Sequence, residues 1–317
     1  MFHLAHLTDL HLPPLPAVRA RDLANKRVLG YLSWQHKRKH EHRSEVVAAL
    51  RRDLDSADGL PAWDHLAVTG DLTNLGLPAE YRAAAAWLDT LGSPASISVV
   101  PGNHDAYIAT ARAATHDHWA PWTTGDDHAT GGAADGTADS TAAGYPYLRR
   151  RGPLSLIGVS TAVPTRPFFA SGRIGPGQLQ RLDALLRHEG AAGRTRVVLI
   201  HHPPQPGVVG VRKGLGDAPA LRAVLAEAGA DLILHGHLHI PMRHTLPGPH
   251  GDIPVLGAGS ASALGHHGRP PAQYHRLAIG PPSPGQPVQA RVVSRGYDAA
   301  RDAFVTLEET RLTLPAS

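Results

Sequence analysis

Histidine, aspartate and asparagine recur at five places in the sequence, each directly after a short apolar run. The five stretches are FHLAHLTDLH (2–11), HLAVTGDLTN (65–74), SISVVPGNHD (96–105), RVVLIHHPP (196–204) and LILHGHLH (232–239). Imidazole rings and carboxylate or amide oxygens are ligands for Mn²⁺, Fe, Zn²⁺, Co²⁺ and Mg²⁺. Cysteine is absent, which excludes disulfides and thiolate metal sites, whereas histidine is abundant at 22 residues. These side chains favour a metal site built from nitrogen and oxygen donors.

Each stretch alone also fits an ordinary structural role. An aspartate after a strand commonly forms a turn, and the GNHD stretch suits a tight turn. The last stretch is more specific, because one residue between His237 and His239 can bring both rings toward one site. Gly236 would let the backbone turn to aim these rings, and His235 is either a supporting residue or simply the end of a strand. Five such stretches in one chain point to a shared site.

The apolar runs are short and rich in Val, Ile and Leu, which is typical of buried strands. Between them, four segments carry apolar residues at helical spacing: 44–57, 79–92, 175–190 and 218–230. Strands that alternate with helices predict an α/β fold. In open α/β sheets, ligands bind beyond the carboxyl ends of the strands. Folding can therefore bring the five polar stretches together, although they are far apart in the sequence.

In this order, the motifs D-x-H, G-D-x-x-N, G-N-H-D, H-H-P and G-H-x-H resemble the signature of the calcineurin-like metallophosphoesterases. The resemblance covers residues 2–240. It implies a four-layer α/β/β/α sandwich of two mixed β-sheets flanked by helices, and we expect residues 1–317 to form a single domain of this type. It also implies a dinuclear metal centre.

The resemblance assigns the metal ligands to residues that follow the predicted strands. The assigned ligands are Asp9, His11, Asp71, Asn103, His201, His237 and His239. One ion would be held by Asp9, His11, Asp71 and His239, and the other by Asp71, Asn103, His201 and His237. Asp71 would bridge the two divalent ions, for which manganese is favoured over iron, zinc, cobalt and magnesium.

The resemblance assigns the remaining motif residues to catalysis or to support. His104 would face the phosphate, where it would stabilise the transition state or protonate the leaving oxygen. Asp105 would orient His104 through a ring nitrogen. His202 and Asn74 would support the ligands or contact the substrate, and we expect the same of His235, which precedes the last motif.

These assignments imply hydrolysis of phosphodiester or pyrophosphate bonds, with a metal-bridging hydroxide attacking phosphorus. A DNA nuclease of the same superfamily is less favoured, because it usually has an added capping domain and only 77 residues follow position 240. A non-catalytic scaffold on this fold should have lost ligands, whereas this chain keeps the whole set. The expected substrate is a small-molecule or lipid-linked phosphate ester, and nucleic acid is not expected as a partner.

Residues 12–43 interrupt the alternation and place aromatic and apolar side chains beside cations, as in NKRVLGYLSWQHKRKHEHR (25–43). That combination suits a membrane interface or an amphiphilic ester. About twenty of these residues resemble an insertion in bacterial enzymes that hydrolyse UDP-2,3-diacylglucosamine. The alternative substrate is therefore such a lipid-linked nucleotide, with peripheral membrane contact through 26–43. A helix packed on the core with a solvated basic face explains the same pattern equally well.

The chain has neither a signal-peptide pattern nor an apolar run long enough to span a membrane. This predicts a cytoplasmic protein whose membrane contact, if present, is peripheral on the inner face. The net charge of +4 and the pI of about 9.6 favour anionic partners without selecting one. Residues 123–144 predict a low-complexity loop, either a flap over the site or an idle surface loop, and residues 288–314 predict a C-terminal β-hairpin.

Overall fold

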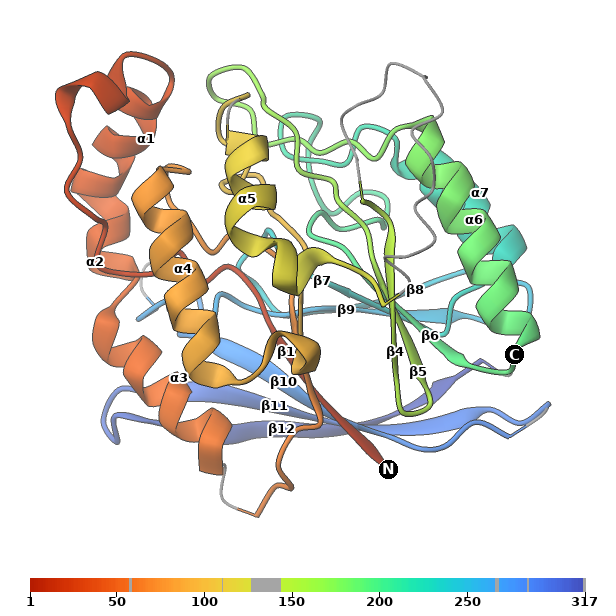
Figure 1. The fold of residues 1–317 in the computed structure, drawn as a ribbon. Coiled ribbons are helices and arrows are strands. Elements are labelled where there is room, and N and C mark those ends of the chain that lie inside the picture. The colour runs from red at the N-terminus through yellow and green to blue at the C-terminus, as the bar shows by residue number, and fades with distance from the viewer. Residues whose placement is uncertain (57–58, 110, 127–143, 266–267, 284, 316–317) are drawn as a thin grey trace.

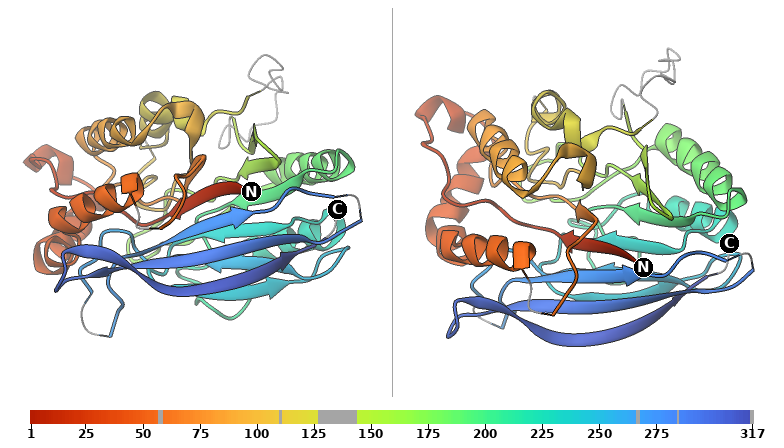
Figure 2. Two further views of the ribbon diagram at one scale, coloured as in Figure 1. Left: turned by 90° about the horizontal axis from the view of Figure 1, so that it is seen from below. Right: turned by 60° about the horizontal axis from the view of Figure 1, so that its bottom comes forward.

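Two six-stranded β-sheets lie face to face, with helices on their outer sides (Figures 1 and 2). The structure, a computed structural model, describes residues 1–317 except 57–58, 110, 127–143, 266–267, 284 and 316–317. Most of the low-complexity stretch 123–144 therefore lies outside the described residues, and both roles expected for it stay predictions.

The first sheet has the strand order β12-β11-β10-β1-β2-β3. Its strands are β1 (Phe2–Leu7), β2 (His65–Val68), β3 (Ile97–Val99), β10 (Gln273–Ile279), β11 (Val288–Asp298) and β12 (Ala303–Leu314). β1, β2 and β3 are parallel, so their carboxyl ends share one edge of the sheet. β10 pairs antiparallel with β1, and β11 and β12 pair antiparallel over the segment where a hairpin is expected.

The second sheet has the strand order β4-β5-β6-β7-β9-β8. Its strands are β4 (Tyr147–Arg151), β5 (Leu154–Gly158), β6 (Thr195–Leu199), β7 (Leu232–His235), β8 (Met242–Leu246) and β9 (Ile253–Gly257). The four central strands are parallel, and the two edge strands are antiparallel to them. Both sheets are therefore mixed.

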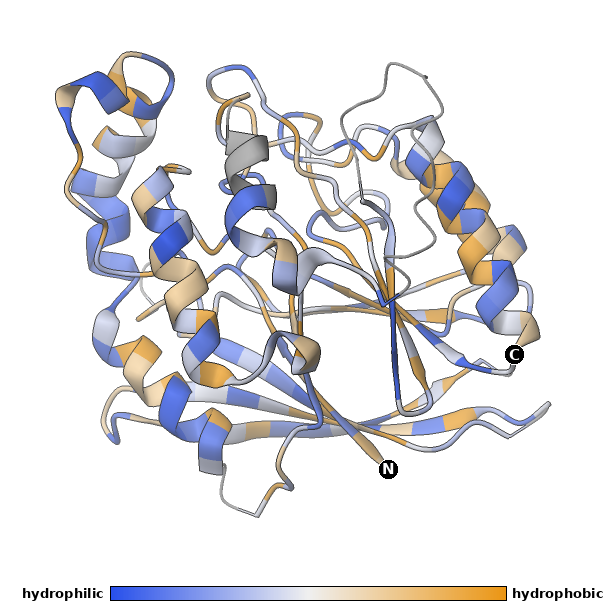
Figure 3. Ribbon diagram, viewed as in Figure 1, coloured by the Kyte–Doolittle hydropathy of each residue, from blue (hydrophilic) through white to orange (hydrophobic). Residues whose placement is uncertain are grey.

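Helices cover the outer face of each sheet through one apolar side. α3 (Ser44–Ser56), α4 (Pro78–Leu91) and α5 (Ala111–Thr123) lie over the first sheet, and α6 (Pro176–Ala191) and α7 (Ala218–Ala228) over the second. Buried leucines recur at helical spacing, as at Leu182 and Leu186 in α6, and Figure 3 shows hydrophobic and hydrophilic positions mixed along these helices. All but α5 begin and end close to the ranges that the sequence predicts.

Apolar cores separate the layers. Leu4 and Leu199 belong to the core between the sheets, whereas Ala5 and Leu7 pack toward the helices. Along β1, successive side chains thus face opposite sides, as strand geometry requires. The predicted four-layer α/β/β/α sandwich is confirmed.

The insertion 12–43 forms a chain of short helical segments. These are η1 (Ala20–Leu23), α1 (Arg27–Ser33), the π-helical turn η2 (Trp34–Arg38) and α2 (Lys39–Glu41). Lys26 and Arg27 donate hydrogen bonds to backbone oxygens of neighbouring loops at 2.8 and 2.9 Å, whereas Lys37 and Lys39 are exposed. These contacts favour a helical segment packed on the core. Throughout the described part of the chain, no helix is long and apolar enough to cross a membrane.

Candidate metal centre

The carboxyl ends of five strands from both sheets meet at one place. Asp9 and His11 follow β1, Asp71 follows β2, Asn103 follows β3, His201 follows β6, and His237 and His239 follow β7. Backbone hydrogen bonds join these segments. The Asp9 amide donates to Gly70 O at 2.9 Å within the first sheet, and the His237 amide of the second sheet donates to Asp9 Oδ2 at 2.8 Å. The structure thus brings together all seven residues predicted as ligands.

Most of these residues have a backbone conformation that L-amino acids rarely adopt. Those with φ between 38° and 79° are Asp9, His11, Asp71, His237 and His239. Elsewhere in the described chain, only Phe168 and Asp302 among the non-glycine residues have positive φ. Left-handed backbone costs such residues about 1–2 kcal/mol, and it persists where the surroundings enforce it, commonly at functional sites. Its concentration here marks this place independently of the side-chain types.

In one half of the centre, nitrogen and oxygen atoms with lone pairs face one another around His201. Its Nδ1 lies 2.7 Å from Thr69 O, which can only accept, so Nδ1 carries the proton of the neutral ring. Its Nε2 lies 3.2 Å from Asn103 Oδ1, 3.3 Å from His237 Nδ1 and 3.5 Å from Asp71 Oδ2. Burial lowers the pKa of His201, but the Asp71 carboxylate outweighs this and raises it to about 9. At neutral pH His201 Nε2 therefore carries a proton in the metal-free protein. A divalent cation that binds among these atoms would replace that proton.

The other half has the same character around His11 and His239. His11 Nδ1 donates to Thr73 O at 2.9 Å, which leaves its Nε2 as a lone pair 3.2 Å from His239 Nε2. His239 Nε2 also lies 3.3 Å from Asp9 Oδ1. That carboxylate oxygen is buried and has no hydrogen-bond partner among the described residues. A cation would satisfy it together with the two rings.

Asp71 lies between the two halves. Its Oδ2 is 3.8 Å from His11 Nε2 and 3.5 Å from His201 Nε2, and its Oδ1 accepts from the His104 amide at 2.7 Å. Burial alone would raise the pKa of Asp71, but His201 and His104 hold it well below its usual value. The buried carboxylate is therefore ionised, and it lies where a bridging ligand would contact two cations.

The His104 ring is held between the backbone and Arg38. Its Nδ1 lies 2.7 Å from Asn74 O, so its Nε2 is the acceptor that Arg38 Nη2 approaches to 2.8 Å. Burial, and secondly the Arg38 charge, lower the pKa of His104 to about 3. The ring is neutral, and the positive charge beside it resides on Arg38. Because Nε2 carries no proton in this arrangement, it can neither protonate a leaving oxygen nor donate to a phosphate oxygen, and both roles expected for His104 stay predictions.

Asp105 makes contacts other than the expected one. Its oxygens accept hydrogen bonds from the backbone amides of Asp71, Thr73 and Gly102, at 2.7, 2.9 and 2.9 Å. The His104 ring is held by Asn74 O and Arg38 instead, so the expectation that Asp105 orients His104 through a ring nitrogen is wrong. The buried carboxylate ties the loop after β2 to the turn after β3, and in this way it positions Asp71 next to Asn103.

The three residues expected to support the ligands lie around the centre in different ways. His202 uses both ring nitrogens in hydrogen bonds to other protein groups, at 2.7 and 3.0 Å, and its ring packs 4.3 Å from that of His237. Asn74 Nδ2 donates to His11 O at 3.2 Å. His235 is fully buried, and its Nε2 lies 3.2 Å from a glutamine amide nitrogen. The first two contact predicted ligands, whereas His235 is linked to the centre through its neighbours in the chain.

Gly236 serves close packing and not a turn. A Cβ atom there would lie 1.8 Å from Thr8 Oγ1 and 2.5 Å from Asp9 Oδ2. The left-handed turns are made by His237 and His239 themselves, with φ of 79° and 58°. The expectation that Gly236 lets the backbone turn is therefore wrong. Its missing side chain lets the end of β7 lie against the loop after β1.

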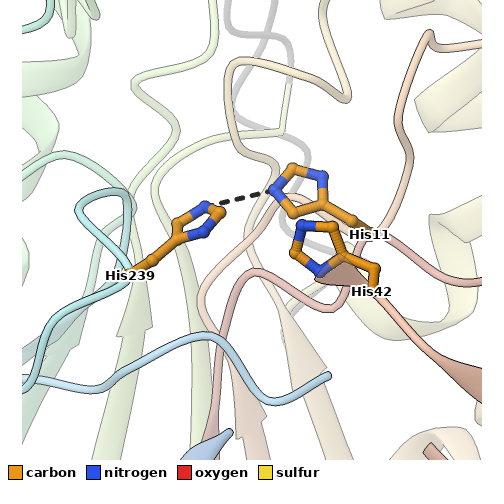
Figure 4. A group of neighbouring side chains, drawn as sticks. All are labelled: His11, His42 and His239. Carbon is orange, nitrogen blue, oxygen red and sulfur yellow. Dashed lines mark hydrogen bonds between the residues drawn. The ribbon is translucent and has the colours of Figure 1, made fainter. Parts of the chain in front are cut away.

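Two residues of the insertion reach the centre without being predicted. Arg38 contacts His104, and the ring centroid of His42 lies 4.6 Å from that of His11 and 5.8 Å from that of His239 (Figure 4). One nitrogen from each of the last three rings lies within 4.8 Å of the others. In the sequence, Arg38 and His42 belong to a basic stretch in which nothing separates them from their exposed neighbours. Only the packing of the short helices shows where they point.

Comparison with known families agrees with this geometry. A family model described as calcineurin-like phosphoesterase matches residues 2–241, a range that includes all seven predicted ligands. The chain belongs to the calcineurin-like phosphoesterase family. Strands β10 to β12, which complete the first sheet of this calcineurin-like phosphoesterase, lie beyond the matched range.

Two proteins similar to this calcineurin-like phosphoesterase share limited sequence identity with it. Over 181 residues it is 28% identical to a probable cyclic nucleotide phosphodiesterase from Synechococcus sp., and the alignment spans 56% of this chain and 58% of that relative. Its fold is similar to the crystal structure of a dimetal phosphatase from Danio rerio, with a TM-score of 0.54, 14% identity, and coverage of 100% of this chain and 99% of that one. At that identity the likeness concerns the fold alone, and it agrees with the four-layer sandwich.

Proposed function

We propose that this calcineurin-like phosphoesterase hydrolyses phosphodiester or pyrophosphate bonds with the help of two divalent cations. The observation that carries the proposal is the convergence of seven donors, whose lone-pair atoms face one another at 2.9–3.8 Å. Such atoms repel unless a cation or a proton lies between them. Imidazole with carboxylate and amide oxygen suits Mn²⁺, Fe, Zn²⁺, Co²⁺ or Mg²⁺, with manganese favoured.

The proposed ligand sets follow the two halves of the centre. One ion would be held by Asp9, His11, Asp71 and His239, and the other by Asp71, Asn103, His201 and His237. When bound, the pair of ions would neutralise phosphate charge. They would also lower the pKa of water, so that hydroxide is available near neutral pH to attack phosphorus. The remaining tasks, orienting the ester and stabilising its charge, fall to side chains beside the ions.

Arg38 and His104 are placed for these tasks. A ring nitrogen of His104 lies within 4.8 Å of donor atoms of His11 and Asp71, and Arg38 Nη2 lies 2.8 Å from His104 Nε2. A guanidinium group binds phosphate oxygens in a bidentate fashion and stays charged at all working pH values. We assign Arg38 to stabilising the negative charge that develops on the phosphate, and His104 Nε2 to holding its guanidinium group in place.

A pocket beside the centre supports a small-molecule substrate. It has a volume of about 260 Å³, and its lining includes His11, His42, Trp34 and Lys39. An aromatic ring and a cation close to the proposed ions suit a nucleotide. The relative from Synechococcus is described as a probable cyclic nucleotide phosphodiesterase, which places cyclic nucleotides among the first substrates to test.

A lipid-linked nucleotide is the second candidate, as in the UDP-2,3-diacylglucosamine pyrophosphatases. Val28 and Leu32 of α1 are 40% and 49% exposed, near the exposed Lys37 and Lys39. Apolar side chains beside cations suit an acyl chain or peripheral contact with a membrane through 26–43. This candidate predicts hydrolysis that depends on the acyl chains, whereas a cyclic nucleotide phosphodiesterase would not need them.

The test combines metal analysis with a hydrolysis panel. We expect elemental analysis to find close to two transition-metal ions per chain, and Mn²⁺ to restore activity after chelation. The panel compares bis-p-nitrophenyl phosphate, p-nitrophenyl phosphate, cyclic AMP, glycerophosphodiesters and UDP-diacylglucosamine. A protein that binds no metal and hydrolyses none of these compounds with Mn²⁺ would refute the proposed function.

Substitution of Arg38 tests its assigned role in stabilising negative charge on the phosphate. Arg38→Met is expected to lower kcat on bis-p-nitrophenyl phosphate by about 100-fold, the usual effect of losing one transition-state donor, while metal content stays unchanged. Arg21→Met, an exposed arginine of the same insertion, should leave both unchanged. In the double variant Arg38→Met/His104→Ala, the fold-loss in kcat should be less than the product of the two single fold-losses, because the two side chains act together. Loss of metal in Arg38→Met would show a structural role instead.

A further inference from the structure

His42 is a buried histidine that the family motifs do not include. It follows α2 at the end of the insertion, and its side chain is 4% exposed. Figure 4 shows its ring beside those of His11 and His239, and one nitrogen from each lies within 4.8 Å of the others. These two neighbours are proposed ligands of the same ion, so His42 lies at the edge of that ion's site.

The hydrogen bonds of His42 determine which ring nitrogen carries its proton. Nδ1 lies 2.8 Å from Ser262 Oγ. The only hydrogen of that hydroxyl is donated to Leu10 O, because a carbonyl oxygen can only accept. Ser262 Oγ must therefore accept from His42, which places the proton of the neutral ring on Nδ1. The other nitrogen, Nε2, is left with a bare lone pair.

That lone pair is buried and lacks a hydrogen-bond partner among the described residues. Buried polar atoms are nearly always paired, so an unpaired one needs a partner that the protein does not supply. The arrangement repeats that of two proposed ligands, since His11 and His201 also direct Nδ1 at a protein oxygen, at 2.9 and 2.7 Å. Histidines that bind metals commonly hold the ring in this way.

We propose that His42 Nε2 is a further ligand of the ion held by Asp9, His11, Asp71 and His239. The inference rests on the proposed function for the existence of that ion. It adds a fifth protein donor, supplied by the insertion. The loop that holds His42 through Ser262 also carries Ser260, whose Oγ donates to Asp9 O at 2.7 Å. The same loop thus positions both the added ligand and the loop after β1.

The experiment measures metal binding directly. Metal-free wild type, His42→Ala, Ser262→Ala and the control His40→Ala are titrated with Mn²⁺ by calorimetry and with Co²⁺ by visible absorption, which responds to the donor set. His40 is an exposed histidine of α2. In His42→Ala we expect one of the two sites to lose affinity about 10- to 100-fold and the Co²⁺ spectrum to change. Ser262→Ala, which keeps the ring but frees its proton to move, should lose less, and His40→Ala nothing.

The outcomes separate this inference from the proposed function. A wild type that binds no metal would refute the proposed function itself. A wild type with two sites and a His42→Ala variant with the same affinities and spectrum would overturn only the ligand. Weaker binding with an unchanged Co²⁺ spectrum would also overturn it, because His42 would then act by hydrogen bonding beside the ion. Thermal unfolding checks that His42→Ala is folded. If it is not, an unchanged Mn²⁺ affinity in Ser262→Ala overturns the proposal.

Discussion

Asp71→Ala is expected to remove both cations and to lower kcat by at least about 10³-fold. Asp71 Oδ2 lies 3.8 Å from His11 Nε2 and 3.5 Å from His201 Nε2, so this carboxylate is shared by the two halves of the centre. Its loss deprives each ion of a charged ligand at once. Metal content after dialysis and kcat on bis-p-nitrophenyl phosphate measure the effect.

The folded state of the Asp71 variant should survive. In the metal-free protein His201 and His104 hold the pKa of Asp71 below its usual value, so the ionised carboxylate stabilises the folded state, and its Oδ1 also accepts from the His104 amide at 2.7 Å. The metal-free variant is therefore expected to fold, but to unfold at a lower temperature than the metal-free wild type. Asp89→Ala, at an exposed position of α4, is the matched control. An Asp71→Ala protein that keeps two ions and most of its activity would contradict the bridging role.

Gly236→Ala is expected to have the second largest effect, this time on folding and metal affinity together. A Cβ atom would lie 1.8 Å from Thr8 Oγ1 and 2.5 Å from Asp9 Oδ2. Thr8 is itself buried and donates to Asp9 Oδ2 at 2.8 Å, so the overlap is relieved only by moving Asp9. We expect the unfolding free energy of the metal-free protein to fall by about 1–3 kcal/mol, measured in urea, and Mn²⁺ affinity to fall with it.

The control for this variant is another glycine-to-alanine change. Gly177 lies in the first turn of α6, where the nearest atom to an added Cβ is a flexible arginine nitrogen at 3.5 Å. Gly177→Ala should leave stability unchanged or raise it, since alanine favours the helix. Adding Thr8→Ala to Gly236→Ala should restore part of the loss by removing the oxygen that is too close. A Gly236→Ala protein as stable and as tight for Mn²⁺ as wild type would contradict the close packing.

The α/β class and the convergence of the five polar stretches could be predicted because their signals are local, whereas the four-layer sandwich and the choice of the seven ligands follow from the family resemblance. Each donor follows a short apolar run, and parallel strands bring such positions to one edge of a sheet whatever their order. The helices between them have enough apolar periodicity to be placed within about two residues, as α3 and α6 show. The sequence does not predict α5, because ARAATHDHWAPWT has weak apolar periodicity and an internal proline.

The contacts that the sequence did not reveal depend on tertiary packing. The family resemblance pairs Asp105 with its neighbour His104, but the Asp105 oxygens accept from backbone amides of loops that only the fold brings near. Nothing in the sequence distinguishes Arg38 and His42 from the exposed side chains around them, since a basic stretch does not show which side chains turn inward. The sequence predicts a turn at Gly236, because a close approach from the other sheet leaves no trace in the local sequence.

The proposed ligand sets draw on both sheets. Each ion would bind residues that follow β1, β2 or β3 of the first sheet and residues that follow β6 or β7 of the second. The sequence contains no cysteine, so no disulfide joins the two sheets. The bound ions would act as cross-links between the sheets, and they could be removed. A ligand present at 100 times its Kd adds about 2.7 kcal/mol to the unfolding free energy. Metal supply would therefore govern the resistance of the protein to proteolysis as well as its rate of hydrolysis. Under metal starvation the enzyme would be both inactive and more readily degraded.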